Sequence, residues 1–472
     1  MPVIRGVCGA AAAAIAAASA GNVQAAVVIS RQPTQNMSCA DGVCQPVAAH
    51  AVLNTGDLET LLAAGNLKVT TKGAGVQAKT IRIADGFGWS TPNALSLVAR
   101  HGVEIAAAVA VQGEGSLAID TGADGALVFR RKGRIGFADT ASGLSINGWN
   151  YTLESSLKAL AQAIANDPSG SYALSGDYDA GNDGTYSKAP VRTALRGRFE
   201  GLGNTVSRLT IAAAGGNVGL FAYNLEGWIG DISVRDAAVA ATKGTIGAVV
   251  GYNAGELSGA HATGSVTADG HATVGGLVGA NTNRGAMTGD DADVAVLVGA
   301  NSSGGGLAGD NSGPISQCFA RGRVKARAAN AEVGGLVGRN SGSVENAYAR
   351  GAAVGAGYAG GLIGYNELGV YTGRAASSYS TGKVKASQFA GGLIGVDDSK
   401  GEYLGDTYWD TTTSRITDPA QGAGSPPNDP GITPLTTTEL QSGLPNGFDA
   451  SVWAQSPNIN DGLPYLVSDP PQ

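Results

Sequence analysis

The chain has 472 residues, 74 of them glycine, and carries a net charge of -7 with 15% charged and 43% hydrophobic residues. So much glycine argues against a helix-dominated protein, because an internal glycine costs a helix about 1 kcal/mol relative to alanine, and the hydrophobic content argues against disorder. The acidic balance argues against nucleic acid as a partner, because nucleic-acid binding needs a clustered basic surface.

Residues 1–25 have the pattern of an export signal. Arg5 gives a positively charged start, residues 7–20 form a small apolar stretch, and residues 18–20 and 23–25 offer small side chains at cleavage spacing. The stretch is shorter than the ~20 residues of a membrane span. We therefore expect a signal peptide, and a secreted or cell-surface protein with no membrane span once the signal is removed. An outer-membrane secretion partner is one route to the surface. A buried alanine-rich helix is the alternative.

Residues 26–50 form an N-terminal segment that contains Cys39 and Cys44. These cysteines enclose four residues with a central Asp-Gly turn, and in an oxidising compartment this spacing predicts a local disulfide. A zinc half-site is the alternative, but the sequence offers no second Cys/His pair to complete four ligands. We expect Cys318 to be a lone buried thiol.

Residues 51–196 contain short alternating strands, such as 80–84 and 94–99, with glycine-bearing turns between them. Two helices are expected to interrupt the strands. One covers 57–64, and the other is a helical insert at 153–166, in which every third or fourth residue is apolar. This stripe should pack on the strands rather than on a membrane, because the opposite helix face is not basic.

An oxygen-rich stretch follows the second helix. Asp177, Asp179 and Asp183 could bind calcium, but the stretch lacks the regular spacing and the distal glutamate of a helix-loop-helix calcium loop. A turn with local side-chain hydrogen bonds is the interpretation that we favour.

An internal repeat organises residues 197–411. A core that reads Gly-Leu-x-Gly in five copies and approximates it in the first two recurs with its central apolar position at 220, 249, 277, 307, 336, 362 and 393, so that the steps run from 26 to 31 residues. Each unit holds about three short strands, none of which buries enough apolar surface alone. Stacked units place equivalent strands about 4.8 Å apart as parallel neighbours. The repeat therefore predicts an all-β solenoid, a parallel β-helix with one coil per repeat that forms a single rod.

A polar residue recurs four positions after each aligned apolar residue. Side-chain amides stacked at one corner can hydrogen-bond along the axis, and a row of ligand-binding amides is the alternative. The expected structural ladder consists of Asn224, Asn253, Asn281, Asn311, Asn340, Asn366 and Asp397. Alternation places Leu336 and Val337 on opposite faces of their strand, and we expect Leu336 to face the interior.

The repeat resembles the GLUG motif of bacterial surface and secreted proteins, many of which have filamentous haemagglutinin-like passengers. Residues 197–211 are similar to the coil that introduces GLUG repeats, and residues 406–411 resemble the block that ends them. The strands of 51–196 resemble haemagglutinin-type passenger coils more loosely. The resemblance implies a right-handed β-helix and an adhesin-like or structural role at the surface.

Residues 435–466 resemble the segment that follows GLUG repeats, and we expect residues 412–472 to form a non-repetitive C-terminal cap and tail. Thr436 and Glu439 are spaced as a capping box, which predicts a short helix. Such an end would seal the last coil against edge-to-edge association.

The sequence offers no catalytic constellation and no cofactor motif. The four histidines lack the spacing of a zinc protease, and neither a Gly-x-Ser-x-Gly elbow nor a phosphate loop occurs. A weak basic stripe for an acidic glycan could come from Arg323, Lys325, Lys383 and Lys385. We therefore predict a protein that is not an enzyme and binds a host, matrix or glycan ligand through an extended solenoid face. A polysaccharide-degrading β-helix enzyme and an inert filament or spacer are the alternatives.

Overall fold

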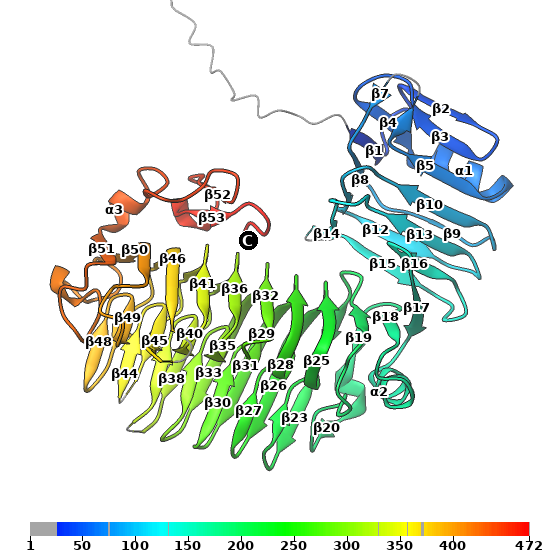
Figure 1. The fold of residues 1–472 in the computed structure, drawn as a ribbon. Helices are drawn as coiled ribbons and strands as arrows, with labels where there is room; N and C mark the ends of the chain where they lie inside the picture. The colour runs from blue at the N-terminus through cyan, green and yellow to red at the C-terminus, as the bar shows by residue number, and fades with distance from the viewer. Residues whose placement is uncertain are drawn as a thin grey trace, which may run out of the picture.

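The computed structural model describes residues 26–73, 76–130, 132–328, 330–355, 357–369 and 372–471. The expected signal peptide, 1–25, lies outside the described residues. The chain forms a right-handed parallel β-helix with short helices and a non-repetitive C-terminal cap, so the predicted fold class is confirmed. The expectation of a single rod is wrong, because the coils form two stacks with separate hydrophobic cores. Figure 1 shows two stacks of coils that meet at an angle, with the C-terminal segment lying along the second stack.

In the first stack, each coil contributes one strand to each of several parallel sheets. Leu95, Leu117 and Leu144 occupy equivalent positions on successive coils, pair in register and are buried. The strands of these sheets are β4 (Ala51–Asn54), β1 (Ala26–Ser30), β8 (Thr80–Ile83), β11 (Val103–Ile105) and β14 (Leu127–Phe129); β5 (Leu67–Thr70), β10 (Ala94–Val98), β13 (Ser116–Asp120) and β16 (Leu144–Ile146); and β9 (Phe87–Trp89), β12 (Ala108–Val111) and β15 (Arg134–Phe137).

A hairpin and a helix cover the N-terminal end of this stack. β2 (Met37–Ala40) and β3 (Val43–Pro46) pair antiparallel, so that Cys39 lies opposite Cys44, and these cysteines form a disulfide. α1 (Thr55–Ala64) follows Asn54, whose side chain accepts hydrogen bonds from two backbone N–H groups of the first turn. Leu58 and Leu62 of α1 are buried in the core of the first stack.

The two stacks meet where the strand direction reverses. β16 pairs antiparallel with β17 (Trp149–Glu154), and β17 then pairs in parallel with β18 (Ser171–Leu174). This reversal interrupts the continuous stacking of coils and separates two hydrophobic cores, one in each stack.

The helix near this junction is shorter than the predicted 153–166. α2 (Leu157–Asn166) begins after Ser156, whose hydroxyl accepts a hydrogen bond from the Ala159 N–H. Leu153 lies in β17 instead, because strand alternation already buries it there. Leu157 and Ile164 are buried against the second core, as the apolar stripe predicts.

The second stack contains the GLUG-like repeats. One sheet, which we call the side sheet, consists of β24 (Asn217–Val218), β27 (Gly244–Ile246), β30 (Ala272–Gly275), β34 (Ser303–Gly305), β39 (Glu332–Gly334), β44 (Tyr358–Gly360) and β48 (Phe389–Gly391). Each strand leads around a corner into β25 (Phe221–Gly230), β28 (Val250–Ser258), β31 (Val278–Asn281), β35 (Ala308–Asn311), β40 (Val337–Asn340), β45 (Ile363–Asn366) and β49 (Ile394–Asp397). A further face carries β26 (Ser233–Ala241), β29 (His261–Ala268), β33 (Asp291–Val298), β37 (Phe319–Ala320), β42 (Tyr348–Ala349), β46 (Arg374–Ser380) and β50 (Leu404–Asp410).

The Gly-Gly-Leu-Val segment turns a corner instead of forming one flat strand. β39 ends at Gly334 and β40 begins at Val337, and both Leu336 and Val337 are fully buried. Strict alternation fails here because the chain bends between the two apolar residues. The bend leaves no space for side chains: a Cβ on Gly334 would lie 1.9 Å from the Val337 carbonyl oxygen, and one on Gly335 would lie 2.1 Å from the Gly361 carbonyl oxygen.

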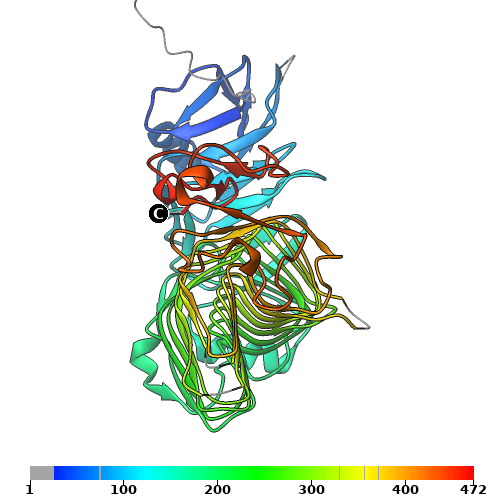
Figure 2. The same cartoon turned by 90° about the vertical axis from the view of Figure 1, so that its left-hand side faces the viewer.

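The C-terminal segment completes the last coil and then returns along the solenoid. β51 (Ile432–Leu435) pairs in parallel with β50, and a capping box begins the short α3 (Thr437–Leu440). β52 (Trp453–Ala454) and β53 (Tyr465–Leu466) then lie over the face that carries β37, β42 and β46. In Figure 2 the coils of the second stack superpose and this segment lies outside them. The helices among the described residues are too short or too polar to cross a lipid bilayer.

Candidate binding face

The polar ladder lies at the corner where each strand from β25 to β49 ends or bends. Its asparagines are almost completely buried, and each Nδ2 donates to the Oδ1 of the equivalent residue on the next coil at 2.8–2.9 Å. The residues joined in this way are Asn224, Asn253, Asn281, Asn311, Asn340, Asn366 and Asp397.

The ladder has a direction, which explains why its last member is an aspartate. Asp397 accepts from the Asn366 Nδ2 and also from the Ser399 and Gly401 backbone N–H groups. A carboxylate offers only acceptors, and the group next to Asp397 is another carboxyl, that of Asp429, whose pKa is raised to about 7 by burial and by its hydrogen bond to Asp397. Asparagine inside the ladder and aspartate at its end therefore satisfy the same hydrogen-bonding rule.

The ladder fixes which side chains point outward on the same strands. The residue before each ladder residue faces solvent by strand alternation. These outward residues pair in register along the stack and are Tyr223, Tyr252, Ala280, Asp310, Arg339, Tyr365 and Val396. They lie beside the outward residues of the side sheet, which include Glu332, Tyr358 and Phe389. We call these two rows of outward residues together the aromatic face.

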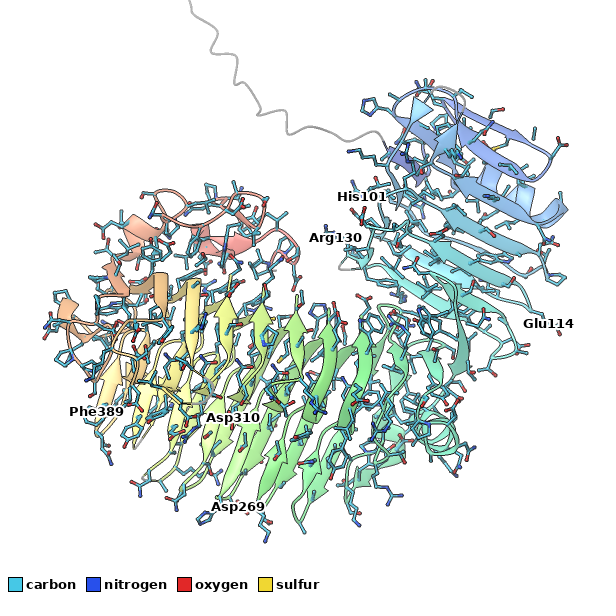
Figure 3. All side chains as sticks on the ribbon, viewed as in Figure 1. His101, Glu114, Arg130, Asp269, Asp310 and Phe389 are labelled. Carbon is cyan, nitrogen blue, oxygen red and sulfur yellow. A yellow bond between two sulfur atoms is a disulfide. The ribbon has the colours of Figure 1, made fainter. Side chains whose placement is uncertain are left out.

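Aromatic rings gather at two places on the aromatic face. Tyr223 and Tyr252, each more than a third exposed, form an edge-on pair with ring centres 6.3 Å apart. Four coils beyond Tyr252, about 19 Å at ~4.8 Å per strand, Tyr358 contacts Tyr365 at 6.3 Å and Phe389 at 5.6 Å. Asp310 and Phe389, labelled in Figure 3, mark the middle and the far end of this face.

Charged groups occupy the space between the two aromatic groups. The Arg339 guanidinium lies over the Tyr365 ring at 5.0 Å and pairs with Glu332 at 3.4 Å and Glu367 at 3.2 Å. Burial raises the pKa of Asp310, although the nearby Arg339 opposes this shift. Burial and a hydrogen bond to Asp398 raise the pKa of the Tyr365 hydroxyl to about 12, so it remains a donor at neutral pH. The face thus combines flat apolar rings with fixed polar groups.

In the structure, each of the three candidate calcium ligands interacts with another group of the protein. Asp177 accepts from the Thr205 N–H, and Asp179 pairs with Arg208. The Asp183 carboxylate accepts from the hydroxyls of two tyrosines, 178 and 186. This arrangement resembles local turn bonding.

Lys325 and Lys385 of the suggested basic stripe lie in one column two coils apart, with a valine between them.

Sequence reasoning did not single out the aromatic face, although its signal is present. The residue before the ladder position is tyrosine in three of the seven repeats, at 223, 252 and 365. The partners Tyr358 and Phe389 belong to the preceding strand, and their proximity depends on the corner at the Gly-Gly segment, which alternation alone does not reveal.

Comparisons with known proteins give one family match and one distant structural likeness. The model of the GLUG motif matches residues 329–354, a segment that includes β39, β40 and β42, so the resemblance to GLUG repeats is confirmed. A solved structure of a candidate immunoglobulin A1 protease from Bacteroides ovatus is 16% identical, with a TM-score of 0.39, covering 68% of this chain and 93% of that chain. That likeness is too distant to carry an argument about function. No curated protein matches the chain.

Proposed function

We propose that this chain, which carries the GLUG motif, is an exported, adhesin-like β-helix that binds an extended glycan along its aromatic face. The observation that carries the proposal is the presence of two groups of outward aromatic side chains on that face, the pair Tyr223–Tyr252 and the group around Tyr365. Aromatic residues with an apolar body and a polar tip, together with arginine, are the side chains that dominate recognition surfaces.

The geometry fits a long ligand better than a small one. Equivalent side chains repeat at about 4.8 Å along the solenoid, and the two aromatic groups lie about four coils apart. Sugar rings can stack on the exposed tyrosines, while Asp310, Glu332 and Arg339 offer acceptors and donors to hydroxyl groups between them. A chain of several sugars would engage both aromatic groups at once.

The proposal can be tested with labelled protein on a glycan array, followed by measurement of Kd for the best ligand. We expect the double variant Tyr252→Ala and Tyr365→Ala to bind at least about tenfold more weakly, because it removes a ring from each group. Trp149→Ala is the matched control, because it removes an aromatic ring that is 54% exposed near the junction of the stacks.

Other outcomes separate this proposal from its alternatives. Equal loss of affinity in the Trp149 variant would contradict a role for the aromatic face. Release of reducing ends or unsaturated products from the bound polysaccharide would favour a degrading enzyme, and a blank array together with blank cell-binding assays would favour an inert spacer.

A further inference from the structure

Another face of the second stack, the one that carries β29 and β33, holds a separate cluster that could bind a metal ion. His261 on β29 and Asp291 on β33 are register partners on neighbouring parallel strands. Ser233, His261 and Asp291 pair in register on successive coils, so their side chains lie on the same surface of the solenoid. The His261 Nδ1 contacts the Asp291 carboxylate. This surface is distinct from the aromatic face.

The returning C-terminal tail brings a third group to this surface. The Arg130 guanidinium of the first stack donates to the Ser468 carbonyl oxygen at 2.6 Å, and this contact holds the tail across the gap between the stacks. Figure 3 shows Arg130 at the tip of the first stack, facing this gap. Asp469, the next residue, places its Oδ2 at 3.8 Å from the His261 Nδ1. Asp469 lies 208 positions from His261 and 178 from Asp291 in the sequence, and the three side chains nevertheless meet at one point.

The three side chains form a suitable donor set. One ligand atom from each of His261, Asp291 and Asp469 lies within 4.8 Å of the other two. Zinc binds imidazole nitrogen and carboxylate oxygen at about 2.0–2.2 Å, so a small inward movement brings all three to bonding distance. Their side chains are 39%, 11% and 30% exposed, so the site is partly enclosed but accessible.

The surroundings leave an open coordination position. The cluster lines a cleft of about 580 Å³, bounded also by Phe129, Arg321 and the tail. Arg321 approaches the Oδ2 of Asp291 at 3.9 Å, which leaves Oδ1 on the histidine side. Arg130 donates to the Ser468 carbonyl oxygen, and burial raises the pKa of Asp469 although the nearby charges of His261, Arg321 and Arg130 oppose this shift. Three protein ligands and an open position are typical of zinc sites that also bind water or a ligand.

We propose that His261, Asp291 and Asp469 bind a divalent transition-metal ion, with Zn²⁺ as the best fit to one imidazole and two carboxylates. Bound metal joins the tail to two coils of the solenoid and holds the C-terminal segment in place. The proposal does not depend on the glycan-binding proposal, because it concerns a different surface and a different ligand.

The experiment uses the full chain stripped with EDTA and titrated with zinc chloride by calorimetry. We expect one site, and at least about tenfold weaker binding in both His261→Ala and Asp469→Asn. His271→Ala and Asp293→Asn are matched controls, because Asp293 is a carboxylate that lines the same cleft without being a ligand and His271 is a histidine outside the cleft, and both variants should bind zinc like the wild type.

Hydrogen exchange of residues 464–471 gives a second readout. Zinc should slow exchange of the tail in the wild type and in His271→Ala, but not in His261→Ala. No zinc uptake at 1 mM, or uptake that both ligand variants retain, would overturn the proposal and leave an ion pair between the histidine and its carboxylates. Circular dichroism confirms that each variant is folded.

Discussion

The ladder direction leads to a prediction for an aspartate placed inside the ladder. In the wild type, the Asn311 Nδ2 donates to the Asn340 Oδ1 at 2.9 Å. Asn311→Asp replaces this donor by an oxygen, so two acceptors face each other in a fully buried position. Asn340 cannot easily turn over, because its own Nδ2 also donates to the Gly342 and Arg374 carbonyls.

The magnitude follows from the protonation that restores the hydrogen bond. A protonated aspartic acid can donate to Asn340, and protonating a side chain of ordinary pKa ~3.9 at pH 7 costs about 1.4 kcal/mol per pH unit, or about 4 kcal/mol in total. The pKa of residue 311 in the folded variant is therefore raised. Its stability should approach that of the wild type near pH 4 and fall as pH rises toward the raised pKa.

Chemical denaturation from pH 4 to pH 8 measures this difference. Asn301→Asp is the matched control, because it makes the same charge change at an exposed asparagine outside the ladder, and it should show almost no pH-dependent loss. If the loss of stability in Asn311→Asp is the same at every pH, or if Asn301→Asp shows the same loss, then the ladder does not have the direction that we describe.

Three further predictions concern other parts of the molecule. Burial raises the pKa of Glu200 to about 7, so its contribution to stability is lost as pH rises from about 4.5 to 7; Glu200→Gln should flatten this part of the denaturation profile, and an unchanged profile would contradict it. Replacing Cys39 and Cys44 by serine should destabilise the first stack by about 2 kcal/mol, as measured by denaturation with and without reductant, whereas an unchanged midpoint would show that the hairpin needs no disulfide. Trp453→Ala removes a buried ring and its hydrogen bond to Asn346, which should cost the cap about 3–5 kcal/mol and speed limited proteolysis after residue 435; a cap that resists protease as before would contradict this.

The repeat period was sufficient to predict the solenoid, because parallel stacking is how short strands bury their apolar sides. The bend between the stacks was not predictable in the same way. It arises from the antiparallel pairing of β16 with β17 across the tight turn at Asn147 and Gly148, both of which have positive φ. An Asn-Gly turn between two strands is a hairpin signal, but its consequence depends on which sheet the second strand then joins.

The candidate sites also differ in whether the sequence alone predicts them. The ladder depends on one residue per repeat, so alignment of the repeats locates it. The zinc cluster depends on the tail, and nothing local to Asp469 indicates that it meets His261. That contact follows from where the cap folds, and the cap is the least repetitive part of the chain.

One column of outward residues nevertheless encodes where the cap lies. In register along the stack, Ser233, His261 and Asp291 are polar, as expected for solvent-facing positions, but the next positions are aromatic. They are Phe319, Tyr348, Tyr379 and Tyr408, separated by 29, 31 and 29 residues, within the range of 26 to 31 residues that the repeat shows.

Outward aromatic residues in a solenoid require a cover if they are to be buried. The rings of Phe319 and Tyr348 stack at 4.7 Å, Tyr348 contacts Trp453 of the cap at 6.0 Å, and the Tyr379 hydroxyl donates to the Pro464 carbonyl oxygen at 2.6 Å. All three rings are almost fully buried. The change from Asp291 to Phe319 therefore marks the edge of the cap, and the polar residues before it are the ones left to line a cleft. The same repeat spacing that builds the coils thus also sets the boundary between a dry docking surface and a site open to ligand.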